Sequence, residues 1–145
     1  PSDLFFKQAA EKDIGIIARV PLASGLLTGK FSQKSTFGTD DHRFFNRNGE
    51  MFDKGETFSG VPYESGLKTV SALEKIFTKE KLAQAALQWI LSFDEVSCVI
   101  PGASRPEQQI VNLKALEQPS LTAQQLASVK EIYQTNIRPL VHHLW

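Results

Sequence analysis

Residues 96–108 read VSCVIPGASRPEQ, and this stretch decides the fold. The apolar, largely β-branched run 96–100 is typical of a short strand that is covered on both faces. Pro101 ends the strand because it has no amide to donate, and Gly102 permits a tight turn. Pro106 stands where the first residue of a helix would be. The stretch therefore predicts a buried strand, a turn and a helix, as in an α/β protein.

The turn between this strand and its helix carries groups that suit an anion. Ser104 supplies a hydroxyl and Arg105 a guanidinium, and Glu107 follows in the first helical turn. A phosphate here would meet helix amides, the positive end of the helix dipole and a forked cation. The alternative is that the small residues only turn the chain, as they do in many α/β proteins. This stretch alone favours neither interpretation.

A second feature of the same kind lies near the N-terminus. Residues 14–20, IGIIARV, show another buried-strand pattern and run directly into PLASGLLTGK at 21–30. Two strands therefore end in turns of small residues. If the strands are parallel neighbours, both turns lie on one side of the sheet.

Several long motifs then resemble one family. Residues 18–31, ARVPLASGLLTGKF, residues 99–108, VIPGASRPEQ, and Asn112 resemble the C-terminal part of an aldo-keto reductase. Residues 41–70, DHRFFNRNGEMFDKGETFSGVPYESGLKTV, and residues 137–145, IRPLVHHLW, resemble a bacterial branch of that family. The motifs occur in the family's order, and the resemblance covers essentially the whole chain.

The resemblance implies an α/β fold of a particular kind, the (β/α)8 barrel. Such barrels take about 250 residues, whereas this chain has 145. We therefore expect the C-terminal portion of a barrel, about units 7 and 8 plus a C-terminal helix. Residues 1–145 would form a single partial domain in which the barrel is incomplete. Its strand edges would then need cover, so a homo-oligomer, a partner chain or a rearranged packing is expected.

The resemblance also implies where the chemistry lies. Such enzymes reduce aldehydes and ketones with NADPH, using an Asp, Tyr, Lys and His set placed earlier in the family's chain. Tyr63, Tyr133, His42, His142 and His143 do not match that set, so no catalytic residue is assigned. The chain alone is expected to be inactive towards a small carbonyl substrate, which only the full-length enzyme would reduce. The alternative is a non-catalytic nucleotide-binding or interaction module that pairs with another chain.

NADP is the cofactor that the resemblance implies. Ser104 and Arg105 would hold its 2′-phosphate, and Gln108 and Asn112 would contact its adenosine from the same helix face. Backbone amides of the first turn would run along the pyrophosphate. The other cofactor-binding residues implied are Arg19, Pro21, Leu22, Ser24, Gly25 and Leu27 on the first turn and Gly102 and Ala103 on the second.

Two positions depart from the pattern of many relatives. Arg19 stands where they place an aromatic residue that stacks on nicotinamide. An arginine plane can cover a ring, but it can also pair with a phosphate or a carboxylate. Gln108 stands where some relatives have a second arginine, so the preference for NADP is expected to be moderate.

Composition excludes several function classes. The 16 basic and 16 acidic residues balance, so no global field favours nucleic acid or an anionic membrane surface. The sequence has no apolar run of the roughly 18 residues that a membrane span needs, and a cytoplasmic location is expected.

Cys98 lies in the predicted strand, where a packed thiol is favoured over a nucleophile. No pattern indicates a metal site.

Residues 31–62 are polar and aromatic with no sustained period, which predicts a long loop on the active-site side. The apolar side chains within it are Phe31, Phe37, Phe44, Phe45, Met51, Phe52 and Phe58. The favoured interpretation is that each anchors the loop to the body. The alternative is that some, with Arg43 or Arg47, belt the cofactor or shape the carbonyl pocket.

Helices are predicted elsewhere from periodicity and capping signals. Residues 3–12 form one. An apolar stripe of Leu67, Val70, Leu73 and Ile76 marks a second helix. Residues 82–90 form a third helix, which Thr78 could cap. The spacing of this third helix places Trp89 in the core. Thr122 and Gln125 form a capping-box pattern at the start of a late helix.

Overall fold

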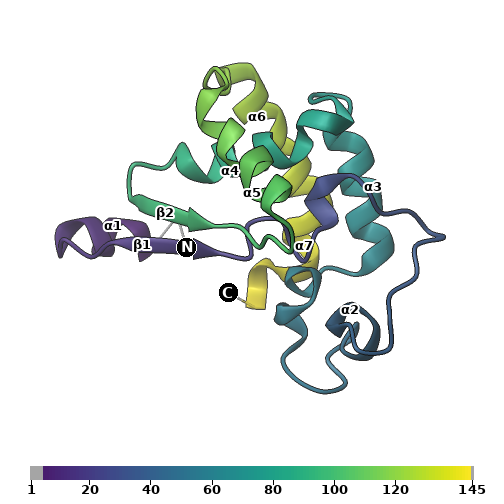
Figure 1. The fold of residues 1–145 in the computed structure, drawn as a ribbon. Coiled ribbons are helices and arrows are strands. Elements are labelled where there is room, and N and C mark those ends of the chain that lie inside the picture. Colours follow the sequence, from purple (N-terminus) through teal and green to yellow (C-terminus); the bar gives the residue numbers. More distant parts are fainter. Residues whose placement is uncertain (1–4, 145) are drawn as a thin grey trace.

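The computed structural model describes residues 5–144 (Figure 1). In chain order its helices and strands are α1 (Phe5–Glu11), β1 (Ile16–Arg19), α2 (His42–Phe45), α3 (Tyr63–Leu73), α4 (Leu82–Leu91), β2 (Val96–Ile100), α5 (Pro106–Leu113), α6 (Ala123–Ile132) and α7 (Arg138–Val141). The expected helix over 3–12 is present as α1, and its first two positions, Asp3 and Leu4, lie outside the described residues.

The two predicted strands pair with each other in parallel. Ile17, Ala18 and Arg19 stand opposite Cys98, Val99 and Ile100, with an irregularity between Ile16 and Ile17. Within residues 5–144 the sheet contains these two strands and no other. Parallel pairing brings the carboxyl ends of both strands, and the turns that follow them, to one side of the sheet, as the sequence predicted.

The expectation that both faces of these strands are covered is wrong for this chain. Ile17 is 63% exposed and Ile100 is 55% exposed, and Cys98 is an exposed thiol rather than a packed one. The β-branched pattern indicates that the strand is suited to a sheet covered on both faces. A sheet of two strands has too few neighbouring elements to supply that environment, so the apolar side chains meet solvent.

The core lies beside the sheet, where α3 and α4 pack against the segments on either side of the long loop. Its buried members are Leu26, Phe58, Val70, Phe77, Leu82 and Ala85. The predicted stripe on α3 is confirmed, since Val70 is buried and Leu67, Leu73 and Ile76 pack around it. Gly66 lets Leu26 approach, because a Cβ at Gly66 would lie 2.5 Å from a methyl group of Leu26.

Trp89 is not a core residue. Its side chain lies at the outer edge of α4, 38% exposed, with its ring edge-on to Phe93 at a centroid distance of 4.9 Å. The helical spacing placed it on the same side as the buried residues of α4. Leu87, two residues earlier, is buried, so α4 stays against the body while the position of Trp89 remains partly uncovered.

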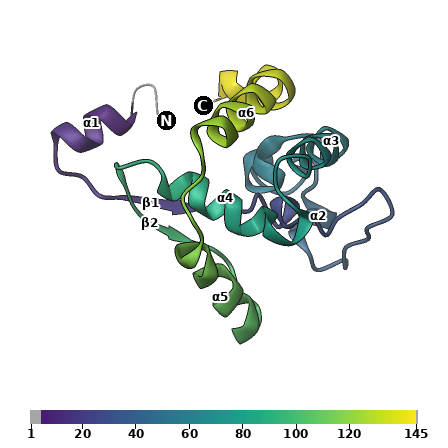
Figure 2. The ribbon, with the colours of Figure 1, turned by 90° about the horizontal axis from the view of Figure 1, so that it is seen from above.

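The later helices follow the capping signals. Pro106 is the first residue of α5, as predicted. Thr122 and Gln125 close the capping box that starts α6, and a π turn (Tyr133–Ile137) joins α6 to α7. Seen from above, α5 and α6 lie on opposite sides of α4 (Figure 2). Between residues 5 and 144, no helix is long and apolar enough to cross a membrane.

Candidate functional site

Several residues of the turn after β1 have left-handed backbone conformations. Val20, Ala23, Ser24 and Gly25 all have positive φ values. At Gly25 a side chain would be strained, because φ is 90° and a Cβ would lie 3.2 Å from the ring of Phe31. The sequence therefore needs glycine there.

Most amides of this turn already have partners. The amides of Gly25 and Leu27 both donate to the carbonyl of Leu22, at 2.9 and 3.2 Å, and the amide of Ala23 donates to Val20 at 3.0 Å. Pro21 is buried, Leu22, Ser24, Gly25 and Leu27 are half-buried, and Arg19 is exposed. The turn is thus pre-formed. Because these three amides donate within the chain, they are not the donors that a pyrophosphate was expected to meet here.

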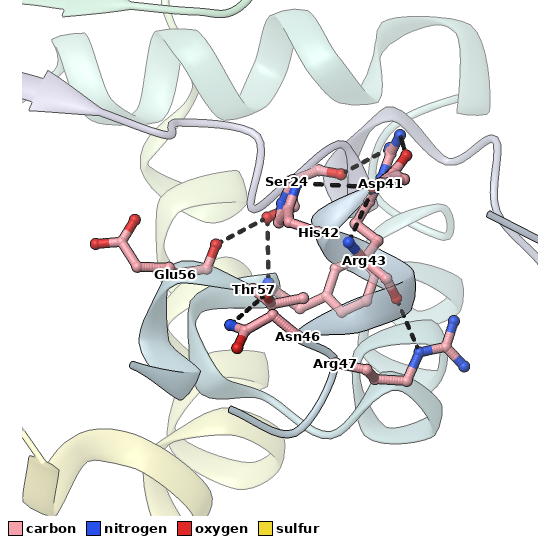
Figure 3. Close-up of polar contacts among 9 residues, drawn as sticks. Ser24, Asp41, His42, Arg43, Asn46, Arg47, Glu56 and Thr57 are labelled. Atoms are coloured by element: carbon pink, nitrogen blue, oxygen red, sulfur yellow. Dashed lines mark hydrogen bonds and ion pairs between the residues drawn. The ribbon is translucent and has the colours of Figure 1, made fainter. Parts of the chain in front are cut away.

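Ser24 joins this turn to two parts of the long loop (Figure 3). Its carbonyl accepts a hydrogen bond from Arg43 Nη1 at 3.2 Å. Its hydroxyl oxygen accepts from the amide of Phe58 at 3.2 Å and lies 3.5 Å from the carbonyl of Glu56. The family resemblance named Ser24 as a residue beside the pyrophosphate, and the structure makes it the point at which the loop is tied to the turn.

Arg19 pairs with a carboxylate, one of the roles left open for it. Its guanidinium Nη2 lies 3.0 Å from Oε2 of Glu56, and both side chains are largely exposed. An exposed pair of this kind contributes less than about 1 kcal/mol. Together with Ser24, it holds residues 56–58 beside the end of β1.

Asp41 fixes Arg43 in place. The Asp41 carboxylate caps α2 by accepting from the amide of Arg43 at 2.9 Å, and it accepts from Arg43 Nε at 2.9 Å. The hydrogen bond from the Arg43 guanidinium holds the pKa of Asp41 below its ordinary value of 3.8, although partial burial acts in the opposite direction. The same hydrogen bond raises the pKa of Arg43 above its usual range.

Replacing Asp41 by asparagine is expected to destabilise the chain in a pH-dependent way. A carboxyl whose pKa is lower in the folded chain stabilises it above the unfolded pKa, and this contribution is lost as the pH falls through the lower folded pKa. We expect Asp41→Asn to cost about 1–2 kcal/mol near neutral pH, because the cap remains but the charged hydrogen bonds are lost. The cost should shrink as the pH falls below 3.8.

Urea unfolding at several pH values, followed by far-ultraviolet circular dichroism, measures this difference. Asp40→Asn is the matched control, since Asp40 is an exposed neighbour of the same type and should change stability by less than about 0.5 kcal/mol. A difference for Asp41→Asn that stays constant down to strongly acidic pH would show that the carboxylate charge is not what stabilises the loop.

Aromatic side chains anchor the long loop to the body, the favoured interpretation for Phe31, Phe37 and Phe58. The rings of Phe31 and Phe37 meet edge to face at 5.2 Å, and Phe58 packs on Tyr63 at 5.1 Å. The guanidinium of Arg43 lies 4.7 Å from the ring centre of Phe37. The same interpretation is wrong for three other apolar side chains of the loop, which remain exposed: Phe44, Met51 and Phe52.

The second turn lies after β2 and is open to solvent. Gly102, Ala103, Ser104 and Arg105 are exposed, and Arg105 is the extended residue that caps α5. Gln108 Oε1 accepts from the amide of Ser104 at 2.7 Å and from its hydroxyl at 3.1 Å. Gln108 therefore closes the turn and leaves the Arg105 side chain at its rim.

Arg105, Gln108 and Asn112 share one face of α5, as their spacing predicted. Gln108 and Asn112 are half-buried there. Because Arg19 and Ile100, the last residues of the two strands, stand opposite each other, both turns start from the carboxyl end of the sheet. The structure therefore brings the two predicted groups of cofactor residues to one side of the sheet.

Sequence reasoning did not single out Asp41, Asn46 or Glu56. Asn46 and Glu56 have partners further along the chain or on another turn, at separations that no local pattern reveals. One signal was available for Asp41, because an aspartate two positions before Arg43 at a helix start is a typical capping arrangement. Asn46 and Glu56 had no such signal.

A family model described as the aldo/keto reductase family matches residues 2–134. The chain belongs to this family. As an aldo-keto reductase chain it shares 33% identity over 120 residues with the L-glyceraldehyde 3-phosphate reductase of Escherichia coli K12, which is 81% of this chain and 33% of that enzyme. It also shares 34% identity over 125 residues with a probable voltage-gated potassium channel subunit beta of Arabidopsis thaliana, covering 84% of this chain and 36% of that protein.

The fold agrees with this assignment. The structure of a glycerol dehydrogenase from Gluconobacter oxydans is similar with a TM-score of 0.68 and 25% identity, covering 93% of this chain and 38% of the dehydrogenase. The aldo-keto reductase chain thus has the fold of part of a (β/α)8 barrel, as expected. It spans about a third of the length of the curated relatives described above.

Proposed function

We propose that this chain is the NADP-binding C-terminal part of an aldo-keto reductase that reduces aldehydes or ketones with NADPH in its full-length form. The observation that carries the proposal is the parallel pairing of β1 with β2. It places the pre-formed turn at 20–29 and the Arg105 turn on one side of the sheet. In open α/β and barrel folds, that side is where ligands bind.

Each turn would take a different part of the cofactor. Arg105 would bind the 2′-phosphate at the start of α5 together with Ser104, and Gln108 and Asn112 would contact the adenosine. The turn of Pro21, Leu22, Ser24, Gly25 and Leu27 would lie along the pyrophosphate. Gly102 and Ala103 would leave room for the backbone to approach the nucleotide. The nicotinamide supplies the hydride, and no residue of this chain is assigned a catalytic role.

Replacing Arg105 by alanine is expected to weaken NADPH binding about 10- to 100-fold, because a charged hydrogen bond to a phosphate contributes about 1.5–3 kcal/mol. NADH binding should change little, since NADH lacks the 2′-phosphate. Fluorescence titration of the purified chain with each nucleotide measures both. Lys114→Ala is the matched control, because Lys114 is an exposed cation just beyond the last turn of α5.

Equal weakening of NADPH and NADH by Arg105→Ala would contradict the 2′-phosphate assignment. A chain that binds neither nucleotide would contradict cofactor binding by these residues alone. In the same preparations we expect no NADPH-dependent reduction of aldehydes, because the family's Asp, Tyr, Lys and His set has no matching positions here. Measurable turnover, after removal of host reductases, would overturn that expectation.

The exposed sheet favours a second candidate function, a non-catalytic nucleotide-binding or interaction module that pairs with another chain or with a second copy of itself. Five large apolar side chains on the strands and α5 are more than 40% exposed: Ile17, Ile100, Ile110, Val111 and Leu113. Monomeric proteins rarely leave such surfaces uncovered. Light scattering across a concentration series discriminates, since a monomer at high concentration would count against this second candidate.

A further inference from the structure

A cavity at the C-terminal end of the described chain lies outside the cofactor residues. It is a shallow depression open to solvent, with a volume of about 400 Å³, and is lined by Gln134, Arg138, Pro139, His142 and His143. The family model matches residues 2–134, so nearly all of this lining lies beyond the part of the chain that the family model describes. The cavity is formed where the π turn between α6 and α7 meets the last described turn of the chain.

The polar side chains of the cavity are held in defined positions. Nη1 of Arg138 donates to Oε1 of Gln134 at 2.7 Å. His142 Nδ1 lies 2.8 Å from the hydroxyl of Tyr133, and the two rings meet edge to face. Each contact uses one polar atom and leaves others, two guanidinium nitrogens and one ring nitrogen, available to a ligand.

The lining is cationic without a compensating acid. Arg138 carries a fixed positive charge, and both histidines can donate N–H groups. Among the described residues no carboxylate lines the cavity, and no ion pair includes Arg138. The site is open to solvent, since only His142 of its lining is half-buried. An arginine beside imidazole donors can still bind an oxyanion through charged hydrogen bonds.

The surrounding backbone supports a site at this place. Val141, between the lining residues, is buried, and its methyl group would lie 3.8 Å from a Cβ at Gly60. The C-terminal turn therefore packs against the segment around Gly60, so its position does not depend on its own residues alone. Single π turns within helices occur frequently at functional sites.

We propose that this cavity is a binding site for a small oxyanion, a phosphate or a carboxylate, distinct from the nucleotide site. Arg138 supplies the charge and His142 and His143 supply N–H donors. Gln134 and Tyr133 act as positioning residues, because they orient Arg138 and His142. The inference does not depend on the proposed function of the two turns after the strands.

The test is residue-resolved NMR of the 15N-labelled chain, titrated with inorganic phosphate and separately with acetate, against sodium chloride at matched ionic strength. Phosphate or acetate should shift the amides of residues 134–143. Arg138→Gln should weaken that response about tenfold, as expected for loss of a charged hydrogen bond, whereas Arg138→Lys should retain part of it. The spectrum itself shows that each variant is folded.

Arg105→Ala tests whether the two sites are independent. It should abolish any phosphate shifts at residues 104–108 and leave those at 134–143 unchanged. A stronger response to phosphate than to acetate, or the reverse, would identify which oxyanion the site prefers. The proposal is overturned if chloride produces the same shifts, if residues 134–143 do not respond, or if Arg138→Gln leaves their response intact.

Discussion

Phe58→Ala is expected to destabilise the chain by about 3–5 kcal/mol. Phe58 is 1% exposed, and its ring lies among Tyr63, Phe37 and Phe31 at centroid distances of 5.1, 6.1 and 6.5 Å. Its removal would leave a cavity where α3 meets the long loop and would expose the rings that depend on it. The backbone amide of Phe58 also donates to Ser24, so a shift of the chain at residue 58 would loosen the turn after β1 as well.

Urea unfolding followed by circular dichroism measures this loss. Phe44→Ala is the matched control, because Phe44 belongs to the same loop but is 56% exposed, and its removal should cost less than about 0.5 kcal/mol. Similar effects of the two variants would mean that the loop does not share a core with α3. If NADPH binds the parent chain, Phe58→Ala should weaken that binding at denaturant concentrations where the variant is still folded.

Asn46→Ala is expected to cost about 2–3 kcal/mol. Asn46 is completely buried, and its Oδ1 accepts from the amides of Met51 and Phe52 at 2.9 and 2.8 Å. Its Nδ2 donates to Thr57 Oγ1 at 3.3 Å. Truncation breaks these hydrogen bonds and a fourth, from Nδ2 to the carbonyl of Asp53 at 3.4 Å. A polar group left unpaired away from water costs about 1–3 kcal/mol.

Asn48→Ala provides the comparison for Asn46. Asn48 is exposed and hydrogen-bonds only its near neighbour Glu50 at 2.8 Å, so we expect less than about 0.5 kcal/mol. Hydrogen exchange of the Met51 and Phe52 amides gives a second measurement, since these amides should exchange faster in Asn46→Ala. Unchanged exchange together with unchanged stability would show that water replaces the side chain without cost.

Local sequence patterns predicted the elements well where the cause of an element is local. The strand at 96–100, Pro106 at the start of α5 and the capping box of Thr122 and Gln125 all depend on residues within a few positions of one another. The resemblance to the aldo-keto reductases identified the family and the partial barrel. The roles of the individual cofactor residues remain predictions that the nucleotide titrations test.

The sequence by itself determined the family and the strand-turn-helix units, because motif, periodicity and capping are properties of neighbouring residues. Tertiary structure alone decided that Cys98 and Ile17 face solvent, that Ser24 ties the turn to the loop, and that Glu56 pairs with Arg19. Burial and pairing depend on which distant segments are present to cover a side chain. A two-stranded sheet lacks that cover, whereas Arg43 and Phe58 of the loop find theirs on the turn after β1 and on α3.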